Sequence, residues 1–288
     1  MYHNILTQQD CPEYDQIKKV IKLLRAFIKI DAIYFSKHLE EPSNNGIITV
    51  LISKSNPHYY EEIYDFSWKI MKSYPEFSFS FYDEAWLKAE LEEGNLYAIM
   101  NCDDSQLLYS ASNFTSVVDF KKIKPKKLIK KITKRFKRHN LESNIIGRDL
   151  RYYNTDGRHL SAAYNVHQQF RYLFINISWF LAGDYTGTES LEEQEEYLRK
   201  FSIVLGNTFD PEKKEEWFVL KQLDEARTAI QWNKEIEPIT KETIDIAYEK
   251  LAILKEEVRR VIDKYIKRVK IKLDDLVSVN KKVSELKK

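Results

Sequence analysis

One stretch of this 288-residue chain is far more basic than the rest, and positive charge at this density can hold phosphate groups. Residues 121–138 contain eleven Lys or Arg and no Asp or Glu. From Lys126 onward, the apolar side chains of the stretch are spaced i, i+1, i+4 and i+8. They are Leu128, Ile129, Ile132 and Phe136. This spacing predicts an amphipathic helix whose other face is covered with basic side chains.

Several ligands would suit such a basic face. It would attract nucleic-acid phosphates with release of counterions, or the surface of an anionic membrane. It could also bind a protein partner, or pair with acidic parts of the same chain such as 189–196, where five of eight residues are Glu. The candidate nucleic-acid-binding residues are Lys126, Lys127, Lys130, Lys131, Lys134, Arg135, Lys137 and Arg138.

A second group of polar side chains lies on a later helical pattern. His167, Gln168 and Arg171 are spaced i, i+1 and i+4, and could donate hydrogen bonds to a phosphate or a base along one helix edge. Alternatively, His167 and Gln168 satisfy buried polar positions between helices while Arg171 is a surface charge. We favour the second interpretation.

Composition excludes several classes of protein. Lys and Arg exceed Asp and Glu by only two, and 43 % of residues are hydrophobic, as in a globular chain. The two cysteines, Cys11 and Cys102, have no metal-ligand spacing, so we predict neither a metal site nor a cofactor. The N-terminus lacks a signal-peptide pattern, and no uncharged apolar run approaches the roughly 20 residues that span a bilayer. We therefore expect a cytoplasmic protein without a transmembrane segment.

The elements that position these residues differ on the two sides of the basic stretch. Before it, helical patterns alternate with short apolar blocks of strand-like length and composition. The helices are expected at 14–27, 60–74 and 84–93, and the strands at 30–35, 47–52, 77–82, 96–100 and 107–109. This half is predicted to be an α+β domain.

After residue 140 the strand-like blocks disappear. Helical patterns cover 158–183, 189–206, 210–230 and a last segment that begins after Pro238 with Thr240 as its cap. Four such helices predict an antiparallel four-helix bundle. The last pattern continues loosely to residue 286, roughly 60 Å if unbroken, as a protruding tail or a dimer-forming coiled coil. The predicted parts are 1–118, a basic linker helix at 119–142, a bundle at 143–270 and an extension at 271–288.

The bundle resembles HEPN domains. The segment Ser161-Ala-Ala-Tyr-Asn-Val-His-Gln-Gln-Phe-Arg-Tyr-Leu-Phe174 is similar to the opening helix of that family. Leu223-Asp-Glu-Ala-Arg227 and Ile239-Thr-Lys-Glu-Thr243 resemble its closing half. The resemblance implies a homodimer formed through the helical domain. Ribonuclease members of the family carry an Arg followed, after four to six residues, by a His.

The first half resembles the nucleotidyltransferase fold, which often precedes a HEPN domain. In that family a strand leads to Gly-Ser, and the next strand bears Asp-x-Asp, which holds metal ions on a nucleotide triphosphate. Here residues 30–37 occupy the place of the first strand with its Gly-Ser, and residues 46–52 that of the second strand. Ser36 and Lys37 are therefore candidate ligand-binding residues.

Both families' catalytic residues are missing from the matching positions. Ser36 replaces the glycine, and Gly46 and Ile48 replace the two aspartates, so the hard oxygen ligands that a divalent ion needs are absent. Arg227 matches the HEPN arginine, but none of the residues at 232–234 is a histidine that could exchange protons near neutral pH. We retain Arg227 as a candidate ligand-binding residue and predict no catalytic residue.

These observations predict a regulatory protein of the nucleotidyltransferase–HEPN type. It would bind a nucleotide or nucleic acid such as RNA, with little or no catalysis. The alternatives are a HEPN ribonuclease with a rearranged active site, as in a toxin or defence protein, and a structural module that binds other proteins.

Overall fold

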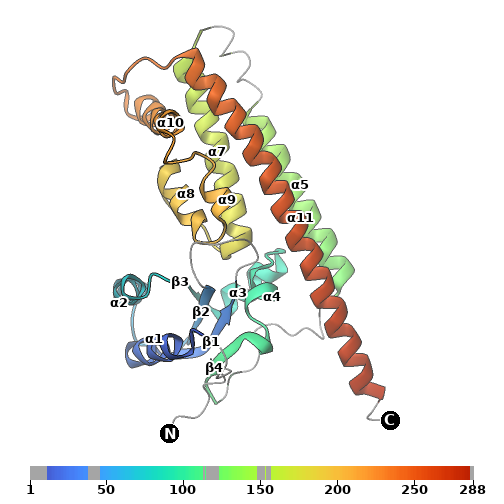
Figure 1. The fold of residues 1–288 in the computed structure, drawn as a ribbon. Coiled ribbons are helices and arrows are strands. Elements are labelled where there is room, and N and C mark those ends of the chain that lie inside the picture. The colour runs from blue at the N-terminus through green and yellow to red at the C-terminus, as the bar shows by residue number, and fades with distance from the viewer. Residues whose placement is uncertain are drawn as a thin grey trace. The chain divides into compact units, whose positions relative to one another are not determined.

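The computed structural model describes residues 12–37, 46–112, 114, 123–147, 153 and 157–285. The chain divides into two compact units (Figure 1). The N-terminal unit comprises the described residues up to Ile129 together with those from Arg268 onward, and the helical unit is Lys130–Lys267. The first contains a mixed sheet, and the elements described in the second are all helices.

A mixed four-stranded sheet organises the N-terminal unit. The strands are β1 (Ile30–Ser36), β2 (Gly46–Ile52), β3 (Phe77–Asp83) and β4 (Leu107–Ser110), in the order β3-β2-β1-β4. β1 is antiparallel to β2 and to β4, whereas β2 and β3 are parallel. A parallel pair requires a crossover connection, which the helix between β2 and β3 provides.

Two helices bury one face of this sheet. These are α1 (Tyr14–Phe27) and α2 (Tyr60–Ser73), whose apolar stripes pack on Ile33, Ile48 and Val50. β2 is buried along almost its whole length. The burial of both of its faces explains why its sequence is a continuous apolar run rather than an alternating one.

Shorter helices complete the unit: α3 (Glu84–Glu92), α4 (Tyr97–Asn101) and the 3₁₀ turn η1 (Asp104–Gln106). The prediction of a strand at 96–100 is wrong, because these residues form α4. The Asn95 side chain accepts a hydrogen bond at 2.8 Å from the backbone N–H of Tyr97, the first residue of the helix. A short apolar run fits a buried helix as well as a buried strand.

The helices outside the sheet begin with α5 (Pro125–Ile146). Those that follow are α7 (His159–Ala182), α8 (Leu191–Arg199), α9 (Ile203–Gly206), α10 (Lys214–Trp232) and α11 (Lys241–Glu285). Within the helical unit, α7 packs against α10 and α8. The helix predicted at 189–206 is broken, because Ser202 leaves the helical conformation and its hydroxyl accepts from the N–H of Leu205 to start α9.

The last helix is longer than a compact bundle requires. The Thr240 hydroxyl accepts a hydrogen bond from the N–H of Thr243 at 3.1 Å, the cap that the sequence predicted. α11 then runs for 45 residues without a break. In the N-terminal unit, Lys272 of this helix forms an ion pair with Asp103.

Candidate functional site

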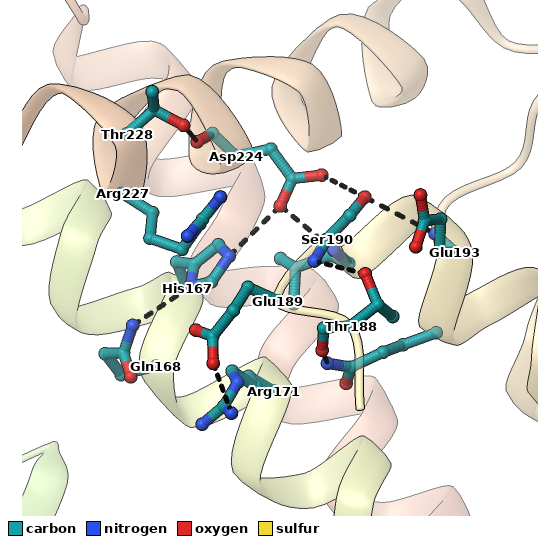
Figure 2. A network of polar contacts seen from close by, with 12 residues as sticks. His167, Gln168, Arg171, Thr188, Glu189, Ser190, Glu193, Asp224, Arg227 and Thr228 are labelled. Atoms are coloured by element: carbon teal, nitrogen blue, oxygen red, sulfur yellow. Dashed lines mark hydrogen bonds and ion pairs between the residues drawn. The ribbon is translucent and has the colours of Figure 1, made fainter. Parts of the chain in front are cut away.

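An aspartate of α10 joins three helices of the helical unit (Figure 2). Asp224 Oδ1 lies 3.0 Å from Nε2 of His167 on α7 and accepts from the backbone N–H of Leu191 on α8 at 2.9 Å. Its Oδ2 accepts from the Ser190 hydroxyl at 2.8 Å. Ser190 is the N-cap of α8, so the carboxylate lies at the positive end of that helix.

This network decides the ionisation of Asp224. Burial alone would raise the pKa of its carboxyl group. The hydrogen bonds from His167, from the Leu191 N–H and from Ser190 outweigh that effect, and they hold the pKa below its ordinary value. Asp224 is therefore a carboxylate that pins α8 and α7 to α10.

His167 is fully buried, and both of its ring nitrogens have partners. Nδ1 lies 3.2 Å from the Gln168 side-chain nitrogen, which can only donate. That contact requires Nδ1 to be the acceptor, so Nε2 carries the proton that is donated to Asp224. No ring nitrogen is left to accept a substrate proton. This geometry corresponds to a histidine that satisfies a buried polar position between helices.

The two arginine candidates lie near the same network (Figure 2). Arg171 donates from Nη2 to Glu189 at 2.6 Å, and Arg227 donates from Nη1 to Gln231 at 2.7 Å. Of the four candidates, only His167 contacts Asp224 directly, and Gln168 contacts His167. The two arginines have partners other than Asp224. As it stands, the cluster holds helices together and has no exposed acid–base pair.

Asp224 was not among the candidate site residues predicted from the sequence. His167 and Asp224 are 57 residues apart, and a lone Asp in a helix that is otherwise rich in charge gives no local signal. The one available hint is its position in the Leu223–Arg227 segment, three residues before Arg227.

The two N-terminal candidates, Ser36 and Lys37, already have partners within the chain. Ser36 is only 3 % exposed, and its hydroxyl donates to the side-chain oxygen of Asn101 on α4 at 2.7 Å. Lys37 forms an ion pair with Glu13 at 2.7 Å. A ligand that used Ser36 would first have to displace Asn101.

Gly46, which the nucleotidyltransferase resemblance would match to a metal-binding aspartate, has no space for a side chain. A Cβ atom on Gly46 would lie 2.6 Å from a ring carbon of Phe35 and 2.7 Å from the Ser36 carbonyl oxygen. The nearby Thr49 hydroxyl is engaged with the Tyr97 hydroxyl at 2.7 Å. The residues present therefore do not fit a metal-bound nucleotide triphosphate.

The basic face predicted at 126–138 is present on α5. One side of the helix is buried through Ile132, and seven basic side chains on the other side are exposed. They are Lys126, Lys127, Lys130, Lys131, Lys134, Lys137 and Arg138, which we call the basic stripe. The remaining candidate, Arg135, lies outside the stripe because its guanidinium packs 3.5 Å from the ring centroid of Trp179 on α7.

Among the described residues, few acidic groups neutralise the basic stripe. Arg138 lies 3.6 Å from Glu142, and Lys131 has a further contact of its own. The other five members form no ion pair with any residue that the structure describes. They are Lys126, Lys127, Lys130, Lys134 and Lys137.

The acidic run at 189–196 has other partners. Glu189 pairs with Arg171, Glu192 pairs with Lys221, and Glu195 is buried. These three carboxyl groups are thus engaged within the helical unit and show no ion pair to the basic stripe.

No protein-family model matches the chain, and no curated protein matches its sequence. In the part of the chain that the structure describes, none of the helices combines the length and apolarity needed to cross a membrane. The same residues contain no group of three or more His, Cys, Asp or Glu side chains arranged to hold a metal ion.

Proposed function

We propose that this protein is a regulatory protein of the nucleotidyltransferase–HEPN type that binds nucleic acid through the basic stripe of α5 without cleaving or extending it. The observation that carries the proposal is the row of exposed lysines and arginine, five of which have no acidic partner among the described residues. A phosphate chain is the natural counterpart of such a row, because each neutralised phosphate releases a counterion.

The shape of the stripe supports backbone contact rather than base reading. At 3.6 residues per turn its side chains fall within an arc of about 140°, and Lys126 to Arg138 span about 18 Å. The opposite side of α5 is occupied by Ile132 and by Arg135 against Trp179. Six of the seven side chains in the stripe are lysines, whose ammonium groups bind phosphate as point charges. The stripe therefore contacts phosphates in a sequence-independent manner.

Binding without catalysis is supported by both resembled sites. Ser36 is buried against Asn101, and Gly46 has no space for a metal-binding carboxylate. His167 is enclosed between Asp224 and Gln168. Neither place offers a free nucleophile, base or metal ligand to a substrate.

A homodimer through the helical unit forms part of the proposal. Phe218, Ile230 and Trp232 of α10 are large apolar side chains that lie exposed in the single chain. Burying such residues is a common reason for association. Light scattering after gel filtration would test this by giving a mass of twice 34.3 kDa.

Charge reversal within the basic stripe tests the binding function. We expect the triple variant Lys127→Glu, Lys130→Glu, Lys134→Glu to weaken binding of a labelled 20-nucleotide single-stranded RNA at least about tenfold in fluorescence anisotropy. The matched control reverses three exposed lysines elsewhere, Lys54, Lys69 and Lys214. An equal loss in both triples would show that overall charge matters and the stripe does not. Unchanged affinity in the first triple would remove the proposal.

A further inference from the structure

The N-terminal unit contains a cavity that includes no residue of the basic stripe. Its volume is about 310 Å³, at the lower end of the range for small-molecule sites. The end of α1, the start of β1, the residues that follow β2, and β4 contribute to its lining. The cavity lies at the opposite end of β1 from Ser36. A ligand here would therefore occupy a place different from both sites that the resemblances suggest.

Basic residues outnumber acidic ones in this lining. The charged residues are Arg25, Lys29 and Asp31, which together carry a formal charge of +1. None of the three forms an ion pair with any residue that the structure describes. A concave site with unpaired cations concentrates their field and so attracts anions.

The arginine of this lining is held in place by an aromatic ring. The Arg25 guanidinium lies 4.3 Å from the ring centroid of Tyr109, a residue of β4 that also lines the cavity. The guanidinium N–H groups have no acceptor among the described residues. The planar fork of an arginine matches the oxygens of a phosphate group. An arginine that is already held by a ring loses less rotational freedom when it binds such a group.

Two serine hydroxyls of the lining supply a further donor. Ser53 Oγ and Ser55 Oγ are 3.0 Å apart, so one hydroxyl donates a hydrogen bond to the other. Each hydroxyl has a single hydrogen to donate, and the hydroxyl that accepts this bond donates to none of the described residues. Its hydrogen is therefore available to a ligand. Together with Arg25 and Lys29, the serines provide three kinds of donor for the oxygens of one phosphate group.

Asp31 and Tyr109 restrict which phosphate compounds fit the cavity. A carboxylate such as that of Asp31 repels a phosphate group but accepts hydrogen bonds from hydroxyl groups. A ligand that carries hydroxyl groups beside its phosphate therefore matches the lining better than phosphate alone. A nucleotide base would stack on an aromatic ring, but Tyr109 is only 9 % exposed and already contacts Arg25. The lining thus favours a sugar phosphate without a base.

We infer that this cavity binds a small sugar phosphate, such as a pentose phosphate. Arg25, Lys29 and the free serine hydroxyl hold the phosphate group, and Asp31 accepts hydrogen bonds from the sugar hydroxyls. This binding goes beyond the nucleic-acid contact proposed for α5, because the two sites share no residue.

Isothermal titration calorimetry of the full-length protein tests the assignment. The probe is ribose 5-phosphate, compared with inorganic phosphate, with ribose and with adenosine 5′-monophosphate. We expect ribose 5-phosphate to bind at least about fivefold more tightly than inorganic phosphate, and ribose not to bind. The double variant Arg25→Gln, Lys29→Gln should weaken ribose 5-phosphate binding at least about tenfold, because charge-assisted hydrogen bonds to the phosphate are lost. The control double, Lys19→Gln and Lys22→Gln, removes the same charge from exposed positions of α1 outside the cavity and should change the affinity less than about twofold.

A second variant tests the sugar end of the site independently. Asp31→Asn should weaken the binding of ribose 5-phosphate but leave inorganic phosphate bound as well as before or better, because the carboxylate repels phosphate. Circular dichroism of each variant checks that it is folded, and Asp31→Asn carries the test if the double variant is not.

Three results would overturn the inference. Failure of ribose 5-phosphate to bind, or an equal loss in the two double variants, would show that the cavity is not a phosphate site. Inorganic phosphate binding as tightly as ribose 5-phosphate would remove the sugar from the assignment. Adenosine 5′-monophosphate binding more tightly than ribose 5-phosphate would show that the site recognises a base, contrary to the role given to Tyr109.

Discussion

A buried glutamate of α8 should make the stability of the helical unit fall as the pH rises. Glu195 is 1 % exposed; its Oε1 accepts from the N–H of Phe209 at 3.0 Å, and its Oε2 has no partner among the described residues. Burial raises the pKa of this carboxyl group to about 8. The Phe209 N–H and the charges of Arg199 and Lys250 oppose the increase only in part.

The direction of the effect follows from the proton balance. The pKa of Glu195 is about 8 in the folded chain and about 4.5 when unfolded, so the folded state holds the proton more tightly. Its contribution to stability is complete below pH 4.5 and is lost as the pH rises towards 8. Each pH unit in between removes up to about 1.4 kcal/mol. Raising the pH from 4 to 7 therefore costs about 3 kcal/mol at this one position.

The variant Glu195→Gln isolates this contribution. Glutamine keeps the size of the side chain and an oxygen for the Phe209 N–H, but it cannot ionise. We expect the variant and the natural protein to have similar free energies of unfolding at pH 4, and the variant to be about 3 kcal/mol more stable at pH 7. Urea unfolding followed by circular dichroism at each pH measures the difference. The control is Glu193→Gln on the same helix.

A difference between the two proteins that does not change with pH would refute the reasoning, because Glu195 would then ionise in the folded state without cost. A pH-dependent difference of the same size in the Glu193→Gln control would refute it as well, since the effect would then belong to the general charge of α8.

Three other substitutions test the packing described above, each measured by urea unfolding. Gly46→Ala should destabilise the N-terminal unit by about 1 to 3 kcal/mol, because the added Cβ meets the Ser36 backbone; unchanged stability would contradict a filled site. Asp224→Asn should cost the helical unit about 2 to 3 kcal/mol at pH 7, because the charge that accepts from His167 is lost, and the difference should shrink at low pH, where the natural carboxylate also becomes protonated. Lys272→Met should cost the N-terminal unit about 1 to 2 kcal/mol by leaving the buried Asp103 without its ion pair; a neutral effect would show that solvent replaces the pair.

Periodicity and turn residues predicted most of the elements, because burial on one face of a helix or on both faces of a central strand leaves a local pattern in the sequence. The stripe of α1 and the apolar run of β2 are local properties of the sequence, and both lie where they were expected. α4 was missed because its five residues, four of them buried, contain too little of either period to distinguish a helix from a strand. The break between α8 and α9 depends on one serine cap, which a longer apolar pattern masks.

The residues of the candidate sites were harder to predict than the elements, because tertiary contacts decide their roles. The sequence placed Arg135 within the basic face, yet its position over Trp179 depends on how α5 packs on α7. Likewise, the partner of His167 lies 57 residues away on α10.

The dependence of RNA affinity on salt tests the central claim most directly. If the five lysines of the basic stripe that lack partners each neutralise one phosphate, a plot of log Kobs against log salt concentration should have a slope of about −3.5 for single-stranded RNA. Reversing Lys127, Lys130 and Lys134 should make the slope shallower, at about −1.4 or closer to zero. A slope near zero in the natural protein, or the same steep slope in the reversed variant, would contradict binding by the basic stripe.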